Sequence, residues 1–181
     1  MKFTPTRIPE VVVIEPRVFE DPRGYFFESY QKALFAEHPL PAEFVQDNHS
    51  FSKKGVLRGL HFQTEPKAQA KLMRVTRGEI FDVAVDIREN SPTLGQHVSA
   101  VLSAENKKML YIPAGFAHGF LALEDAEVLY KASNVYSSQH ERGILWNDPE
   151  LGIQWPKLDT SYLLSEKDQR YPTFREMFLK Q

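Results

Sequence analysis

Short runs of β-branched and aromatic residues, separated by turn-forming residues, recur along the whole chain. Residues 11–14 and 80–87 are clear examples, and twelve prolines and nine glycines are spread between such runs. β-branched and aromatic side chains favour strands, whereas proline and glycine favour turns. The pattern predicts strands at residues 11–14, 44–51, 56–63, 71–76, 80–87, 98–102, 109–112, 119–123, 128–132 and 144–146. A succession of short strands of this kind is typical of a β-sandwich or barrel.

Helical patterning is confined to two places. One is residues 30–37, and the other lies near the C-terminus, where Ser165 and Asp168 have the S-x-x-D spacing of a capping box. No internal repeat, linker or low-complexity segment interrupts the chain. Because 181 residues suit one hydrophobic core, we expect a single all-β domain, residues 1–181, with a few short helices at its periphery.

Composition narrows the possible partners. The chain has no cysteine, no apolar run long enough to span a membrane and no apolar signal segment in residues 1–9, so we expect a soluble, cytoplasmic protein with no membrane partner. Its formal net charge of -2 gives no general basic field, which argues against nucleic acid as a partner. A small anionic ligand is compatible with this charge, because a few arginines and lysines in one pocket bind a phosphate.

Residues 56–63 place an arginine and a histidine, Arg58 and His61, in a segment that otherwise has the pattern of a buried strand. A buried arginine is costly unless it is paired, and histidine is the side chain best suited to proton transfer near neutral pH. Strict alternation would direct Arg58 and His61 to opposite faces of the strand, so a shared pocket requires a bulge, which we predict at Gly59. A satisfied core histidine with an arginine at the rim is the alternative interpretation.

A second segment, residues 113–118, has the form P-x-G-x-x-H and ends at His118. It resembles the second signature of the cupins, small double-sheet barrels whose first signature, H-x-H followed by a glutamate, shares metal ligation with that histidine. His61 fits the first histidine, but Gln63 stands at the second and Lys71 at the glutamate. An ammonium group repels a divalent metal and suits an anionic oxygen, which argues against a metal site. A surface position is the alternative for Lys71.

Seven segments, including the two already described, extend the comparison along nearly the whole chain. Residues 21–28, 44–50, 56–63, 115–120, 129–131, 146–149 and 164–168 resemble, in the same order, the motifs of the dTDP-4-dehydrorhamnose 3,5-epimerase family. The resemblance implies a cupin-like double-sheet jelly-roll barrel. It also implies a small-molecule nucleotide-sugar substrate, dTDP-4-dehydro-6-deoxy-D-glucose, whose C3 and C5 are inverted to give dTDP-4-dehydro-L-rhamnose. Neither a cofactor nor a metal is implied.

The resemblance assigns the chemistry to four residues. His61 is the expected base and Tyr130 the expected acid on the opposite face of the sugar ring, because a proton that leaves and returns on different sides inverts the carbon. Lys71 is expected to face the C4 oxygen and stabilise the enolate. Asp168 is expected to hydrogen-bond His61 and favour its imidazolium form, although the capping box is a structural alternative for this residue.

The same resemblance implies a larger set of substrate-binding residues: Arg23, Phe26, Glu28, Gln46, Asp47, Asn48, Arg58, Lys71, His118, Tyr136, Glu141 and Lys167. Arg23, Arg58 and Lys167 suit a diphosphate, and Tyr136 is a candidate to stack on thymine. Solvated surface charge is the alternative for Arg23, Glu28 and Glu141. The family forms homodimers with exchanged N-terminal strands, so we expect residues 1–30 to be an exchanged arm that carries Arg23 and Glu28 to the partner.

Several other functions compete with this interpretation. Gln63 and Lys71 disfavour a metal-dependent cupin oxygenase or isomerase, and a ketoisomerase of the same nucleotide sugar would carry a histidine at position 63. A non-catalytic sugar-binding module has no reason to combine a base, an acid and a cation. An epimerase that inverts only C3 or only C5 shares the motifs, so the sequence alone does not separate it from a double epimerase.

Overall fold

The computed structural model describes residues 1–38, 40 and 43–178. The strands in these residues are β1 (Lys2–Pro5), β2 (Val12–Glu15), β3 (Phe19–Asp21), β4 (Gly24–Phe26), β5 (Gln46–Ser52), β6 (Leu57–Gln63), β7 (Lys71–Arg77), β8 (Glu79–Asp86), β9 (His97–Ser103), β10 (Met109–Ile112), β11 (Phe116–Ala122), β12 (Ala126–Ala132) and β13 (Glu141–Gly143). The helices in the same residues are α1 (Lys32–Ala36) and α2 (Phe174–Phe178), and neither is long and apolar enough to cross a lipid bilayer. The predicted all-β class is confirmed.

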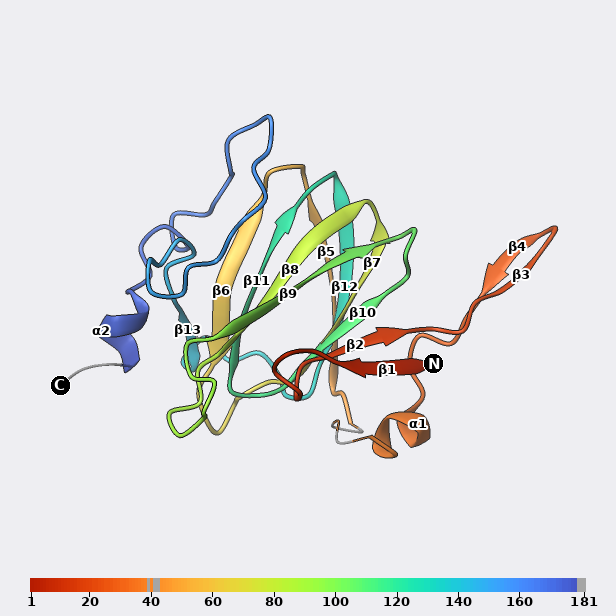
Figure 1. Cartoon of the computed structure of the whole chain (residues 1–181), viewed down its shortest axis with the longest axis horizontal. Helices are drawn as coiled ribbons and strands as arrows, with labels where there is room; N and C mark the ends of the chain where they lie inside the picture. Colours follow the sequence, from red (N-terminus) through yellow and green to blue (C-terminus); the bar gives the residue numbers. More distant parts are fainter. Residues whose placement is uncertain (39, 41–42, 179–181) are drawn as a thin grey trace.

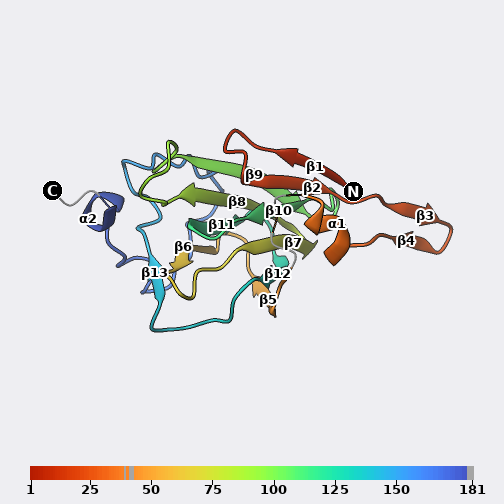
Figure 2. The same ribbon diagram turned by 90° about the horizontal axis from the view of Figure 1, so that it is seen from below.

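Two antiparallel sheets make the body of the molecule (Figure 1). One has six strands in the order β1-β2-β10-β7-β12-β5, and the other has five in the order β13-β6-β11-β8-β9. Strands that are distant in sequence pair with each other, as β2 does with β10, which gives the cupin-like double-sheet jelly roll. Figure 2 shows the body from a second side, with the hairpin of β3 and β4 projecting from one end and α2 at the other.

The core between the sheets follows from the alternation of side chains along each strand. Met73 of β7 and Ile80 of β8, which belong to opposite sheets, are both fully buried in the same apolar cluster. A side chain of this size contributes roughly 1.5–3 kcal/mol when it is buried. Lys71 and Asp82 lie two residues from Met73 and Ile80 on the same strands, so the alternation directs two charged groups toward the space between the sheets.

The outer faces of the two sheets are covered as well. Phe174 of α2 belongs to a second apolar cluster with Leu60 of β6 and Val85 of β8. Phe35 of α1 belongs to a third with Leu72 of β7. The chain that follows β13 is therefore held against the five-stranded sheet, close enough for its polar residues to reach β6.

Two predicted elements differ from the structure. The strand predicted at residues 144–146 is wrong, because β13 ends at Gly143 and the backbone N–H of Leu145 donates to the carbonyl of Pro172 at 2.9 Å, outside the sheet. The capping box does not begin a helix. The backbone N–H of Asp168 donates to Ser165 Oγ at 3.1 Å within a turn, and α2 begins six residues later. The S-x-x-D spacing stabilises a turn as well as a helix start.

The β3–β4 hairpin and β1 were not predicted from the sequence. The hairpin extends away from the body (Figure 1), and its large apolar side chains are mostly exposed. Phe19, Tyr25 and Phe26 are 51%, 60% and 66% exposed. Large apolar side chains grouped on a projecting element are typical of a surface that binds another protein surface.

Candidate active site

Strand β6 carries both Arg58 and His61 to one pocket because its regular alternation is interrupted at Gly59. Gly59 has a φ of 132°, which favours glycine, and the pairing of β6 with β11 changes register opposite it. A Cβ at this position would lie 2.5 Å from a Cα of β11, so the close approach of the two strands also requires glycine. Arg58 and His61 line the same pocket, of about 200 Å³. The irregularity predicted at Gly59 is confirmed.

Two adjoining pockets share His61, Lys71 and Tyr130. The first also contains Gln46, Asn48, Phe62, Gln63, Gln69, Tyr136 and Glu141, and the second contains Ser50, Arg58, Met73, His118 and Phe120. His61 belongs to the five-stranded sheet and Tyr130 to the six-stranded sheet, so the two side chains reach the shared space from opposite walls. A small molecule held there meets a proton-transfer group on each side.

His61 is backed by a carboxylate from the C-terminal part of the chain. Its Nε2 lies 2.6 Å from Oδ1 of Asp168, which is buried. Burial alone would raise the pKa of Asp168, but hydrogen bonds from His61 and Ser165 and the charge of His61 lower it overall. The carboxylate is therefore charged at neutral pH and favours a proton on Nε2. Nδ1 is left as the nitrogen that can accept a proton.

Lys71, at the position of the cupin glutamate, places a desolvated cation in both pockets. Burial lowers the pKa of its ammonium group to about 8, against the opposing charges of Asp82 and Glu141. An ammonium group with this pKa is mostly charged at neutral pH. It offers a positive charge to an anion that develops in the pocket.

Asp82, which sequence reasoning missed, is fully buried and bonds His118. The distance from His118 Nε2 to Asp82 Oδ1 is 2.6 Å. Burial lowers the pKa of His118, and the charge of Asp82 opposes that effect. Asp82 belongs to no motif that the sequence comparison used. The only indication in the sequence is that Asp82 is an acidic residue at an inward position of β8, where the neighbouring residues are mostly apolar.

Tyr130 is half-buried in the wall opposite His61. Burial raises the pKa of its phenol above the ordinary value. The hydroxyl group is therefore protonated at neutral pH and can act as a donor toward the shared space.

Five of the predicted residues form a hydrogen-bonded group at the rim of the first pocket. The amide of Gln46 donates to Asn48 Oδ1 at 2.9 Å, and the backbone N–H of Tyr136 donates to Gln46 Oε1 at 2.9 Å. The hydroxyl of Tyr136 donates to Glu141 Oε2 at 2.9 Å, and Lys167 forms an ion pair with the same carboxylate. Tyr136 stays 57% exposed, which leaves an aromatic face available for stacking.

Arg58 is held by neutral groups at the edge of the second pocket. Its Nε donates to Ser52 Oγ at 3.0 Å and its Nη2 donates to the carbonyl of Phe51 at 3.1 Å. These contacts orient the guanidinium group without neutralising its charge. An arginine held in this way is suited to a phosphate.

Comparison with known proteins identifies the family. The sequence profile of dTDP-4-dehydrorhamnose 3,5-epimerase matches residues 5–176. The dTDP-4-dehydrorhamnose 3,5-epimerase of Pseudomonas aeruginosa is 57% identical over 180 residues, which cover 97% of each chain. This chain belongs to the dTDP-4-dehydrorhamnose 3,5-epimerase family.

Solved structures agree with the assignment to this epimerase family. The dTDP-4-dehydrorhamnose 3,5-epimerase of Elizabethkingia anophelis NUHP1 matches with a TM-score of 0.94 and 47% identity over 98% of each chain. The dTDP-6-deoxy-D-glucose-3,5-epimerase RmlC of Legionella pneumophila Philadelphia 1, in complex with dTDP-4-keto-L-rhamnose, matches with a TM-score of 0.92 and 44% identity. That match covers 97% of this chain and 94% of the other. The predicted fold and family are confirmed.

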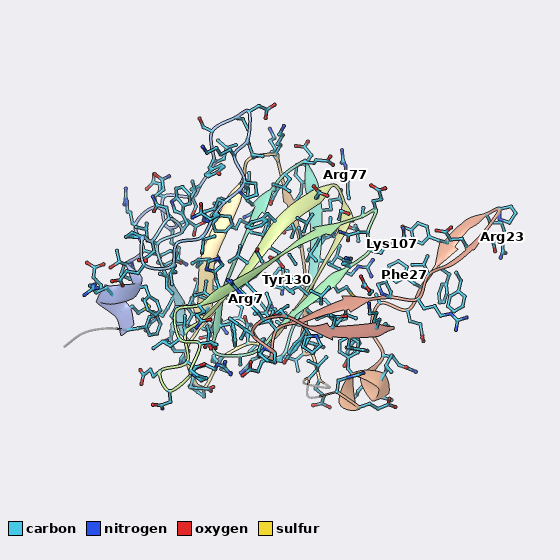
Figure 3. The ribbon with its side chains drawn as sticks, viewed as in Figure 1. Arg7, Arg23, Phe27, Arg77, Lys107 and Tyr130 are labelled. Atoms are coloured by element: carbon cyan, nitrogen blue, oxygen red, sulfur yellow. The ribbon has the colours of Figure 1, made fainter. Side chains whose placement is uncertain are left out.

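Five of the predicted binding residues do not line the two pockets of this epimerase. Lys167 is connected to the first pocket through its ion pair with Glu141, whereas the other four lie elsewhere. Arg23 lies at the tip of the β3–β4 hairpin, whereas Tyr130 lies within the body (Figure 3). Phe26 and Glu28 are exposed on the same arm. Asp47 points to the other face of β5, where it forms an ion pair with a lysine of β12 at 2.9 Å. One chain therefore does not bring these four residues to His61.

The two positions at which the epimerase departs from the cupin metal pattern have other partners. Gln63 Nε2 donates to the carbonyl of Lys67 at 2.6 Å, and Gln63 Oε1 accepts from the backbone N–H of Ser137 at 2.6 Å, so this amide ties two loops together. Lys71 supplies the ammonium described above. Within residues 1–38, 40 and 43–178, no group of three or more histidines, cysteines, aspartates and glutamates is arranged to hold a metal ion. Metal independence stays a prediction.

Proposed function

We propose that this epimerase inverts both C3 and C5 of dTDP-4-dehydro-6-deoxy-D-glucose and releases dTDP-4-dehydro-L-rhamnose, without a metal or a cofactor. One observation carries the proposal: Lys71 places a cation in the space that His61 and Tyr130 enter from opposite walls. The Legionella pneumophila epimerase in complex with dTDP-4-keto-L-rhamnose supports the class of substrate.

The reaction begins with the removal of a proton next to the ketone. The C4 carbonyl acidifies the hydrogens on C3 and C5, so His61 Nδ1 takes one of them while the C–H electron pair forms an enolate with C4. Lys71 faces the enolate oxygen and stabilises its negative charge. Asp168 stabilises the imidazolium that has formed.

Inversion is completed from the other wall. Tyr130 donates its proton to the same carbon on the opposite face, and the C4 carbonyl forms again as the enolate electrons return to carbon. Exchange with solvent then removes the proton from His61 and restores the one on Tyr130. The second carbon follows by the same two steps, so each inversion exchanges one carbon-bound hydrogen for a solvent hydrogen.

The remaining residues of the site hold the nucleotide and the sugar. Arg58 binds the diphosphate, because its guanidinium group is oriented by neutral partners and keeps its charge. Gln46 and Asn48 read the edge of the base or a sugar hydroxyl, and Tyr136 stacks on thymine through its exposed ring. The remaining members of the binding set, His118, Glu141 and Lys167, complete the walls around the sugar and phosphates.

The proposal includes a homodimer of single-domain cytoplasmic subunits in which the β3–β4 hairpin of the N-terminal arm, residues 1–30, is exchanged, while β1 and β2 pair within the sheet of their own chain. The projecting hairpin exposes Phe19, Tyr25 and Phe26, which a second subunit would cover. The same exchange would carry Arg23, Phe26 and Glu28 to the partner's pocket, and it gives a reason why these residues lie outside the pocket of their own chain.

Incubation with dTDP-4-dehydro-6-deoxy-D-glucose in deuterated water tests the function. We expect NMR to show deuterium at both C3 and C5 of an inverted product, with the same result after prolonged chelation of the enzyme. The variant His61→Ala is the control and should lose exchange at both carbons. Deuterium and inversion at only one carbon would show a single epimerase, and activity restored by one divalent ion after chelation would refute the metal-free mechanism.

A further inference from the structure

The imidazole of His61 has a second neighbour besides Asp168. The ring of Tyr171 lies with its centroid 5.7 Å from that of His61, at an interplanar angle of 70°. Rings prefer such an edge-to-face arrangement to a parallel sandwich. Asp168 therefore fixes His61 at Nε2 by a hydrogen bond, while Tyr171 contacts the ring itself.

Tyr171 occupies this position because Gly143 leaves room for it. Gly143 pairs directly with His61 where β13 joins β6. A Cβ built on Gly143 would overlap three carbon atoms of the Tyr171 ring. The aromatic ring thus rests on the backbone of the residue opposite His61 and fills the place that any other side chain would take.

One short segment, residues 167–172, supplies both neighbours of His61, the carboxylate of Asp168 and the ring of Tyr171. The backbone N–H of Arg170 donates to the carbonyl of Lys167 at 3.1 Å, which closes a turn that contains Asp168 and ends directly before Tyr171. The carbonyl of Pro172 accepts from the backbone N–H of Leu145 at 2.9 Å, which ties the end of that turn to the residues after Gly143. Backbone hydrogen bonds on both sides therefore fix the chain from which the Tyr171 ring projects.

The hydroxyl group of Tyr171 contributes little to this arrangement. It is buried and makes no hydrogen bond of regular geometry within the described residues, although the ammonium group of Lys167 lies close by, 5.9 Å from the ring centroid. Tyr171 also does not line either of the two pockets that contain His61. The contact with His61 is therefore one of ring against ring, and Tyr171 has no direct access to a substrate.

We propose that Tyr171 is a positioning residue for His61: its ring, resting on Gly143, holds the imidazole in the orientation in which Asp168 bonds Nε2 and Nδ1 faces the pocket. The inference rests on the proposed role of His61 as base. Proton abstraction is sensitive to such alignment, since a misplacement of about 1 Å can cost on the order of a hundredfold in rate. A phenylalanine at position 171 should therefore support the same activity as Tyr171, whereas a small side chain should not.

Two variants separate the ring from the hydroxyl group. Tyr171→Phe should keep the kcat of the parent enzyme. Tyr171→Ala should lower kcat roughly 10- to 100-fold, whereas the Kd for dTDP should change much less, because the ring contacts the binding residues only through Lys167. Deuterium exchange and inversion should fall by the same factor, since both follow the proton abstraction by His61. Retained dTDP binding also establishes that the variant is folded.

A double-mutant cycle with Gly143 tests the mechanism of the effect. Gly143→Ala in the parent enzyme should lower kcat, because the new Cβ displaces the Tyr171 ring. In a Tyr171→Ala background the same substitution should cost nothing further, because the ring is already absent. The two losses are then strongly non-additive, as expected for residues that act through one contact.

The outcomes distinguish this inference from the proposed function. If Tyr171→Ala retains the parent kcat, or if Tyr171→Phe loses as much as Tyr171→Ala, the positioning role is refuted. If the losses from Gly143→Ala and Tyr171→Ala multiply, Gly143 acts on His61 by another route and the ring contact is not the cause. A parent enzyme that exchanges no deuterium, or a His61→Ala variant that exchanges as fast as the parent, refutes the proposed function instead.

Discussion

Raising the pH should inactivate this epimerase as Lys71 loses its proton. Burial lowers the pKa of its ammonium group to about 8, compared with 10.5 for an ordinary lysine. The charged fraction is then about 90% at pH 7, about half at pH 8 and about 10% at pH 9, whereas an ordinary lysine would be about 97% charged at pH 9. Because only the cation stabilises the enolate, we expect kcat/KM to fall about tenfold per pH unit above this pKa.

The charges around Lys71 determine in which direction a nearby substitution moves its pKa. Asp82 and Glu141 oppose the effect of burial, so Glu141→Gln should lower the pKa further and move the alkaline limb to lower pH. Burial lowers the pKa of His118, which lies in the same pocket, so its loss of charge belongs to the acid side of the profile. Tyr130 does not account for a limb near pH 8, because burial raises its pKa above the ordinary value near 10.

The assay is the pH dependence of kcat/KM, which reports the free enzyme, from about pH 6 to about pH 10. Circular dichroism at each pH confirms that the protein is folded. Lys71→Arg is the matched control, since a guanidinium group keeps its charge over this range and should give a slower enzyme without the alkaline limb. A limb near pH 10 in the parent enzyme, or the same limb in Lys71→Arg, would refute the assigned role.

Three further predictions concern the acid, the diphosphate and the dimer. Tyr130→Phe should leave deprotonation by His61 intact, so that NMR in deuterated water finds deuterium beside the ketone with retained configuration; inversion at the parent rate would assign the acid elsewhere. Arg58→Ala should weaken dTDP binding by roughly 1.5–3 kcal/mol in calorimetry, and unchanged affinity would leave Arg58 a structural role. Mixing Arg23→Ala chains with His61→Ala chains should restore part of the activity through intact mixed sites, and its absence after verified subunit exchange would exclude a contribution of Arg23 across the dimer.

Much of the site was accessible from the sequence because its residues lie in strands with regular alternation. The pattern around His61 required an irregularity to bring Arg58 to the same side, and Gly59 provides it. The replacement of a cupin ligand by Lys71 indicates a cation in the pocket from the motif spacing alone. In both cases a local rule, the period of two along a strand or the spacing of a motif, determined where the side chain lies.

The rest depends on contacts that no local rule describes. Asp82 and Tyr171 act on histidines that are distant in sequence, so neither carries a pattern of its own. The S-x-x-D spacing at Ser165 predicted a helix, but the carboxylate of Asp168 bonds His61 and only the other half of the capping interaction is made. The β3–β4 hairpin packs too few of its own residues to show the apolar alternation by which strands are recognised.

The carboxylate behind His61 is carried by a segment that lies outside both sheets. Between β13 and α2 the chain is mainly turns and irregular structure, and Phe174 is one of the few buried residues that hold its end against the sheet. Detachment of this segment between β13 and α2 would remove Asp168 from His61 while leaving the strands of both sheets paired. Partial openings of this kind require less free energy than global unfolding. Mild heat or denaturant would therefore abolish turnover while the barrel still gives its native far-ultraviolet spectrum, and protease nicking of this segment would do the same.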